Sequence, residues 1–160
     1  MFNDSKVTIK DVAKEVGGES AANSSSNTET VITSKELILD YKARKARFET
    51  NVHVVDPKME MFCDVLEIQM GQDNQINWIG ASTGVRILNE GREALAGKAT
   101  YDIKTDEFVL EDNPRIMDGK NMLVGDKIRL WRGSKRMVCE PAARMVFYSD
   151  KQLKANFFEK

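Results

Sequence analysis

The sequence predicts an all-β protein, and three features of the chain support this prediction. From Val31 onward, Val, Ile, Leu, Phe, Tyr and Met recur at alternate positions in short runs, which is the periodicity of half-buried strands. Gly, Asn and Asp residues that favour turns separate these runs. An internal repeat relates two parts of the same region. We therefore expect short strands joined by tight turns, with no long helix after residue 30.

The chain begins with a predicted helical lead and a flexible linker. Residues 1–17 carry apolar residues at helical spacing, whereas residues 18–30 are rich in Ser, Asn, Gly and Ala and too polar to bury a core. The run from Val7 to Gly17 is similar to the first helix of a LacI-type helix-turn-helix. The polar linker occupies the place where a recognition helix is required, so we expect no nucleic-acid partner. The predicted organisation is a lead and linker at 1–30, a β-domain at 31–148 and a C-terminal tail at 149–160.

Within the β-domain, nine segments have the strongest strand pattern. They are Thr50 to Val55, Met59 to Ile68, Gln75 to Ile79, Gly84 to Leu88, Lys98 to Ile103, Glu107 to Leu110, Met122 to Leu130, Arg136 to Cys139 and Arg144 to Tyr148. Turn signals fall between them. They are Asp56-Pro57, Asp73-Asn74, Asn89-Glu90-Gly91, Thr105-Asp106, Asp118-Gly119 and Arg132-Gly133.

The repeat appears when the chain is shifted by 62 residues, the separation of Asp40 from Asp102. The other identities pair Lys42 with Lys104, Asn51 with Asn113, Asp56 with Asp118, Lys58 with Lys120, and Asp64 with Asp126. The apolar positions keep the same phase. They pair Phe48 with Leu110, Val54 with Ile116, Met61 with Leu123, Leu66 with Ile128, and Ile68 with Leu130. Repeated β-units stack on one continuous apolar interior, and the two ends of the stack leave unpaired backbone groups.

Composition and motifs exclude several classes of protein. The formal net charge is -1, from 24 basic and 25 acidic side chains, so the chain has no global field for nucleic acid or an anionic membrane. No apolar run is long enough to span a membrane as a helix. The first ten residues lack a signal-peptide core, which is also expected of a secreted protein in its mature form, after removal of the signal peptide. Cys63, Cys139 and the single histidine, His53, have no metal-ligand spacing. Because catalytic motifs are also missing, we expect no enzyme, no cofactor and no metal. Whether the two cysteines form a disulfide stays open.

An ordered series of turns and short strands follows Gly97. It consists of Tyr101-Asp102, Phe108 to Leu110, Asn113-Pro114, Asp118-Gly119, Asn121, and Gly125-Asp126-Lys127-Ile128. This series resembles the repeated signature of the LptA/OstA-like family, the organic solvent tolerance-like domains. The first unit resembles the opening of that family but departs from it at Cys63-Asp64, where the family has a small residue before Asp. The likeness covers residues 30–148.

The resemblance implies a twisted β-jelly-roll, open at both ends, that carries lipopolysaccharide across the periplasm. It also implies edge pairing with other Lpt-type β-jelly-roll domains or with a second copy of the chain. Alternation by itself places every second residue inside, where an apolar trough would suit lipid A acyl chains. The predicted lipid-binding residues are Phe48, Val52, Val54, Met61, Leu66, Ile68, Trp78, Ile87, Phe108, Leu110, Ile116, Leu123, Ile128 and Leu130.

Two basic clusters are candidates for binding phosphorylated headgroups or for protecting strand edges. The first contains Lys42, Arg44, Lys45 and Arg47, and the second contains Lys127, Arg129, Arg132, Lys135 and Arg136. Alternation points Lys127 and Arg129 outward and turns His53 away from its valine neighbours. An alternative function stays open, that of a structural adaptor which joins an envelope complex by β-augmentation and holds no lipid. Interior packing distinguishes the adaptor from the carrier.

Overall fold

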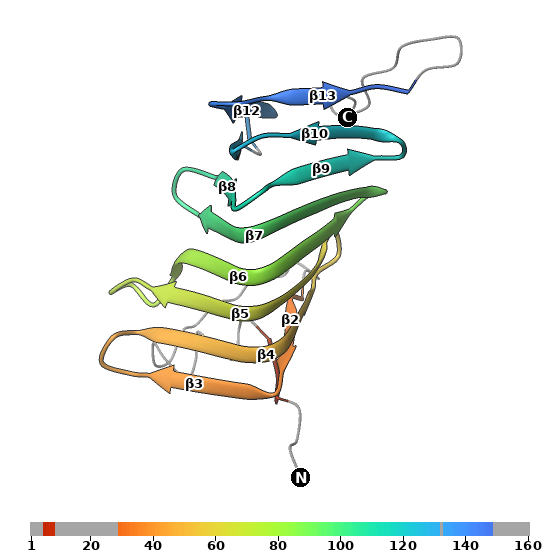
Figure 1. Ribbon diagram of the computed structural model, residues 1–160. Helices are drawn as coiled ribbons and strands as arrows, with labels where there is room; N and C mark the ends of the chain where they lie inside the picture. The colour runs from red at the N-terminus through yellow and green to blue at the C-terminus, as the bar shows by residue number, and fades with distance from the viewer. Residues whose placement is uncertain (1–4, 9–28, 132, 149–160) are drawn as a thin grey trace.

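The computed structural model describes residues 5–8, 29–131 and 133–148. These residues form one sheet of thirteen strands (Figure 1), and no helix occurs among them. The strands are β1 (Ser5–Thr8), β2 (Val31–Ser34), β3 (Glu36–Asp40), β4 (Lys45–Val55), β5 (Glu60–Met70), β6 (Ile76–Asn89), β7 (Arg92–Asp102), β8 (Glu107–Glu111), β9 (Arg115–Asp118), β10 (Asn121–Val124), β11 (Lys127–Trp131), β12 (Arg136–Glu140) and β13 (Arg144–Val146). Accordingly, no helix in the described ranges is long and apolar enough to cross a membrane.

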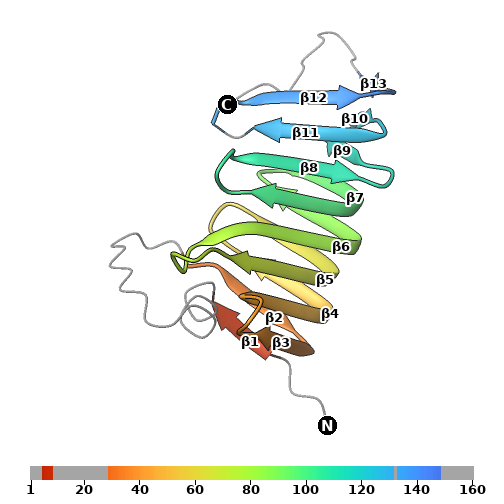
Figure 2. The same ribbon diagram turned by 90° about the vertical axis from the view of Figure 1, so that its left-hand side faces the viewer.

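The sheet folds over into two walls because its long strands bend in the middle (Figures 1 and 2). Strand β4 pairs with β3 through residues 45–49 and with β2 through residues 53–55. Strand β7 pairs with β8 through residues 98–102 and with β9 through residues 92–95. The first wall therefore contains β3, β8, β11, β12 and one half of each long strand. The second wall contains β1, β2, β9, β10, β13 and the other halves.

The bends are made by residues with left-handed backbone conformations. Thr50 (φ 68°) and Asn51 (φ 52°) interrupt the pairing of β4, and Thr83 (φ 66°) and Gly84 (φ 62°) interrupt that of β6. Such β-bulges bend a strand and increase its twist. In the second half of the chain, Asp112 (φ 61°) and Asn113 (φ 57°) separate β8 from β9 completely.

The repeat identified in the sequence is a structural repeat. Shifted by 62 positions, Thr50 and Asn51 fall on Asp112 and Asn113, which have the same backbone conformation. Asp40 accepts a hydrogen bond from the Ala43 N–H, and Asp102 likewise caps its own turn through the N–H groups of Lys104 and Thr105. The two units thus share their turns as well as their apolar phase. They differ at these positions. In the first unit β4 bends at Thr50 and Asn51 and continues, whereas in the second unit β8 ends before Asp112 and Asn113 and β9 begins after them.

The apolar residues of each wall form a continuous row that crosses eight strands, from β3 to β12 in the first wall and from β2 to β13 in the second. In the first wall, the row of register partners is Leu37, Phe48, Leu66, Ala81, Ala99, Leu110, Ile128 and Cys139. In the second wall, it is Ile32, Val54, Met61, Ile87, Ala94, Ile116, Leu123 and Met145. All of these residues belong to one buried or partly buried cluster, so the core lies between the walls along the whole stack.

Several predicted element boundaries are wrong, and the bends explain most of the errors. The segments Gln75 to Ile79 and Gly84 to Leu88 are parts of the single strand β6, because the bulge bends the chain without ending the strand. Met122 to Leu130 is divided into β10 and β11 at Gly125. The predicted segments missed β2, β3 and β9. They also placed the start of β4 at Thr50 instead of Lys45 and the start of β7 at Lys98 instead of Arg92.

The predicted helical lead is wrong where the structure describes it. Residues 5–8 form β1, which pairs antiparallel with β2. The rest of the predicted lead and most of the linker, residues 9–28, lie outside the described residues, as does the predicted tail at 149–160.

Candidate lipid-binding interior

Most of the predicted lipid-binding residues meet between the two walls. Those that are buried there are Phe48, Val52, Val54, Met61, Leu66, Ile68, Leu110, Ile116, Leu123 and Ile128. Ile87 and Leu130 are partly buried and pack against this cluster. Phe108 is a register partner of both Leu130 and Tyr101, and its ring stacks on that of Tyr101 with 4.2 Å between centroids.

Trp78 is placed on the opposite face of the first wall. Its register partners are Gln69 and Asp102, while the neighbouring Ile79 packs against the core. A Cβ atom at Gly80 would lie 2.2 Å from an indole carbon, so the ring of Trp78 covers this glycine. A register shift between Gln69 and Met70 allows Ile76 to join the core although it is only two positions from Trp78. Simple alternation cannot anticipate such a bulge.

A further apolar row lies beside the turns of the first wall and is less completely covered. Its register partners, in spatial order, are Leu39, Ala46, Ile68, Ile79, Tyr101, Phe108, Leu130 and Met137. Leu39, Ile79, Leu130 and Met137 are partly buried against the core. The Tyr101 hydroxyl donates a hydrogen bond of 2.7 Å to Asp106, which holds that ring in place. We call this row the mouth row, since it lies beside the turns and most of its members are only partly buried.

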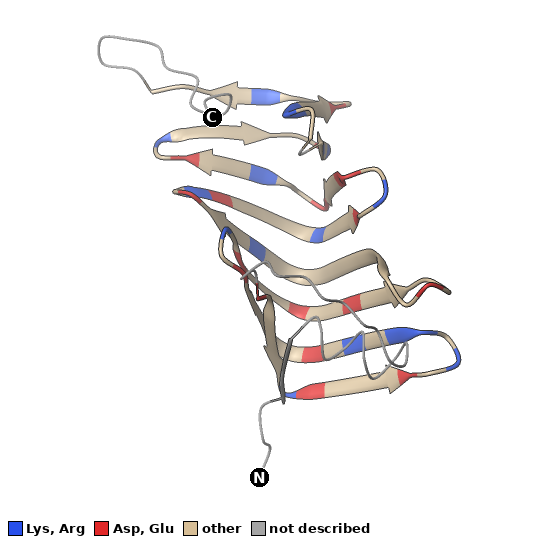
Figure 3. Cartoon of the chain, turned by 180° about the vertical axis from the view of Figure 1, so that it is seen from behind, with Lys and Arg blue, Asp and Glu red and all other residues tan. Residues whose placement is uncertain are grey.

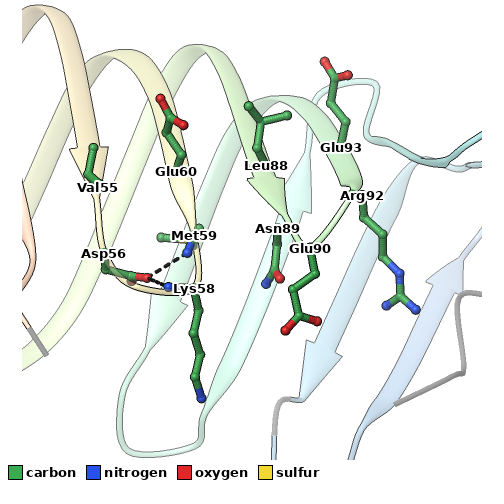
Figure 4. A pocket seen from close by; sticks show the side chains of 11 residues that line it. Val55, Asp56, Lys58, Met59, Glu60, Leu88, Asn89, Glu90, Arg92 and Glu93 are labelled. Carbon is green, nitrogen blue, oxygen red and sulfur yellow. Dashed lines mark hydrogen bonds between the residues drawn. The ribbon is translucent and has the colours of Figure 1, made fainter.

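A shallow pocket of about 470 Å³ lies at the turns of the second wall (Figure 4). The β4–β5 turn and the β6–β7 turn form it, and Asp56 fixes the first of these by accepting hydrogen bonds from the N–H groups of Lys58 and Met59. Its lining combines the apolar Val55, Met59 and Leu88 with several charged residues. The register partners Val55, Glu60, Leu88 and Glu93 in this lining lie on the outer face of the second wall, so the pocket belongs to the outer surface and not to the interior.

The first basic cluster is divided between structural and exposed side chains. Arg47 pairs with Glu49 at 2.5 Å and with Glu67, and the hydrogen bond that Arg47 donates to Glu49 raises the pKa of its guanidinium. Arg44 donates to the Gly71 carbonyl at 3.2 Å and to the Asn74 side chain at 2.7 Å, so it ties together two turns. Lys42 and Lys45 are exposed. Only the two lysines match the prediction of cations directed at solvent.

In the second basic cluster, Lys127 and Arg129 lie on the outer face of the first wall, as alternation predicted, whereas Arg132 lies outside the described residues. Ile128 is fully buried, whereas its neighbours Lys127 and Arg129 pair across strands with Glu111 at 3.1 Å and Glu107 at 2.7 Å. Arg129 and Arg136 also lie over the Trp131 ring, at 4.9 and 5.3 Å from its centroid. Figure 3 shows charges of both signs interspersed over the strands. Such matched charges form a solvated outer surface more readily than an anion site.

The two cysteines and the single histidine lie in strands β5, β12 and β4. Cys63 and Cys139 are free thiols, and burial raises the pKa of Cys63 to about 12. The His53 Nε2 atom lies 2.7 Å from a Glu60 carboxylate oxygen, and its ring stacks on Phe62 on the outer face of the second wall. Among the described residues, no group of three His, Cys, Asp or Glu side chains could hold a metal ion.

Comparison with known proteins identifies the family. No curated protein sequence matches the chain. Among solved structures, the chain is similar to the crystal structure of LptH from Pseudomonas aeruginosa, described as the LptA-homologous periplasmic component of the lipopolysaccharide transport device. The TM-score is 0.67 and the sequence identity 13%, over 75% of this chain and 95% of the other, so the two share the open β-jelly-roll fold. A family profile described as "LptA/(LptD N-terminal domain) LPS transport protein" matches residues 31–136, and the chain therefore belongs to this family of lipopolysaccharide-transport proteins.

Proposed function

We propose that the chain holds the acyl chains of lipopolysaccharide between its two walls and passes the lipid to the next domain across abutting strand edges. The observation that carries this proposal is the uninterrupted set of apolar rows that run from β3 to β12 in the first wall and from β2 to β13 in the second. Membership of the family supports lipopolysaccharide transport as the role. We assign the protein to the periplasm, the compartment named for LptH.

The length of the rows suits a lipid that moves along the stack. Each row crosses eight strands, and seven spacings of about 4.8 Å give roughly 34 Å. An acyl chain occupies about half of a bilayer core of ~30 Å, so it covers about half of a row. Cargo shifted by one strand would keep most of its apolar contacts, each buried methylene contributing about 0.8 kcal/mol.

The rows are buried against each other, so the walls must part to admit lipid. Entry at the mouth row requires the smallest change because its side chains, apart from the buried Ala46 and Ile68, are already partly exposed. We infer that the walls part at the bulges of β4 and β6, where the pairing between neighbouring strands is interrupted. The partly buried Met137 and Met145 are unbranched side chains that adapt to an irregular ligand.

The ends of the stack support transfer between domains. Within the described residues, β12 and β13 at one end, and β1 and β3 at the other, each have one strand partner. Their second edges leave backbone N–H and C=O groups that a neighbouring domain can pair with by β-augmentation. Head-to-tail pairing would place the apolar rows of two domains in line.

Photo-crosslinking tests the proposal with two matched pairs of positions. A crosslinking side chain at Leu130 in the mouth row, or at Leu123 in the second wall, should capture purified lipopolysaccharide. The outward-facing neighbours Arg129 and Met122 are the controls and should capture little. Failure at both inner positions, in protein shown to be folded, would remove the carrier function and favour the adaptor that pairs edges without holding lipid.

A further inference from the structure

Three corners of the chain meet on the outer surface near the C-terminal end of the stack. They are the β8–β9, β10–β11 and β12–β13 connections, and they enclose a pocket of about 600 Å³. The residues that line it are Asn113, Arg115, Val124, Gly125, Asp126, Ala142, Ala143 and Arg144. This corner pocket is separate from the lipid-binding interior because its strand residues lie on the outer face of the second wall.

Two arginines flank the pocket from opposite sides. Val124 in β10 is the register partner of Arg115 in β9 and of Arg144 in β13, so all three share one face. Their backbones are two strand spacings apart, about 10 Å, a distance that two arginine side chains can bridge to reach one ligand. Both arginines are exposed.

These arginines differ from most of those on the outer surface. Arg47, Arg86 and Arg129 each pair with a carboxylate of a neighbouring strand. Within the described part of the chain, neither Arg115 nor Arg144 makes an ion pair or a hydrogen bond to another side chain. Among the described residues, therefore, no side chain occupies their donors.

The pocket is held open by the way the corners pack. A Cβ atom at Gly125 would lie 2.2 Å from the Cys139 Sγ atom and 2.9 Å from the Ala142 carbonyl oxygen, so the β12–β13 corner lies directly against this glycine. Pro114, beside Arg115, is fully buried and anchors the β8–β9 corner. The small side chains of Ala142 and Ala143 leave the space between the arginines unfilled.

We propose that the corner pocket binds the phosphoryl group of a phosphorylated ligand, with Arg115 and Arg144 as its two cationic contacts. The guanidinium fork donates two parallel hydrogen bonds to phosphate oxygens. Asp126 also lines the pocket, so two guanidinium groups and one carboxylate leave one net positive charge. At equal separation, that charge attracts a phosphate dianion twice as strongly as a carboxylate monoanion. The site does not depend on the lipid-carrying function, because it lies outside the interior.

Inorganic phosphate is the first probe, titrated into the full chain at low ionic strength while the backbone amides are followed by NMR. We expect saturable shifts at Val124 and Gly125, with sodium chloride of matched ionic strength as the control. Arg115→Gln and Arg144→Gln should each weaken phosphate binding about tenfold, the change that corresponds to 1.4 kcal/mol. Asp126→Asn should strengthen it. Arg86→Gln, which removes an arginine already paired with Glu93, should leave it unchanged.

The source of the phosphoryl group is distinguished with a phosphorylated monosaccharide and the same sugar without phosphate. Equal affinity for inorganic and sugar phosphate would indicate that the pocket recognises phosphate alone, and tighter binding of the sugar phosphate would indicate a lipid or sugar headgroup. The proposal is wrong if phosphate causes no saturable shifts, or if the two pocket variants behave like Arg86→Gln. Because both arginines are exposed, circular dichroism should show both variants folded, and the gain expected for Asp126→Asn is an independent check.

Discussion

Two adjacent valines in β4 offer a direct test of which side of the sheet is the interior. Val54 is 5% exposed and lies in the second-wall row between Ile32 and Met61, whereas Val55 is 42% exposed on the outer face. Substituting each by alanine removes the same two methyl groups from the same strand. The loss of intrinsic strand preference is therefore nearly equal in the two variants and cancels in their difference.

The difference in unfolding free energy follows from burial. Val54→Ala removes two buried methyl groups at about 0.8 kcal/mol each and leaves a small cavity, so we expect a loss of about 2 kcal/mol. Val55→Ala should cost no more than ~0.5 kcal/mol, the usual range for a surface substitution. For a chain of this size, a difference of about 1.5 kcal/mol corresponds to roughly 3–6 °C in Tm.

Urea unfolding followed by circular dichroism measures both variants, and thermal melting provides a second estimate. A shift of the strand register by one residue would exchange the two faces. An equal or larger loss for Val55→Ala would therefore refute the assignment of the interior and of the apolar rows.

Further consequences concern the bends, the buried thiol and the domain boundary. Thr50 and Thr83 are β-branched residues at φ values of 68° and 66°, a left-handed conformation that asparagine adopts more readily. Thr50→Asn and Thr83→Asn should therefore each raise the unfolding free energy by about 1 kcal/mol, measured as an increase in Tm. The control Thr33→Asn, in the extended strand β2, should give no increase. Cys63 is buried, so it should react with a thiol reagent only when the protein unfolds. In native protein its reaction rate should therefore be well below that of Cys139, and equal rates would contradict its burial. Because burial raises the pKa of Cys63 from 9.0 to about 12, the unfolded state loses this proton first as the pH rises. Stability should therefore fall above pH ~9, by up to about 1.4 kcal/mol per pH unit, and this part of the fall should be missing in Cys63→Ala. We also propose that residues 29–148 form the domain, since the buried core residues of the described chain lie between Ile32 and Ile128; this fragment should retain its β circular dichroism and a cooperative thermal transition, and loss of the transition would place residues 1–28 within the folding unit.

Much of the fold follows from local sequence signals. Period-two alternation assigned the inward positions of the central strands because side chains of a strand must alternate between faces. Turn chemistry at Asp40, Asp56 and Asp102 is also local, since each carboxylate accepts hydrogen bonds from backbone N–H groups two or three residues later. The repeat carried both signals together, and its apolar pairs occupy equivalent positions in the two units.

Tertiary structure decided the features that depend on bulges and on pairing between distant segments. A bulge near Asn77 placed Trp78 on the outer face, and the bend at Thr83 and Gly84 kept β6 continuous. Pairing with β2 made a strand of residues 5–8, where the local pattern favoured a helix. The approach of Arg115 to Arg144 depends on β10 lying between β9 and β13, a contact between residues far apart in the chain. Alternation and turn signals are properties of neighbouring residues, and they therefore specify which residues face inward. The assembly of the two walls, in contrast, determines which strands bend and which charges remain unpaired.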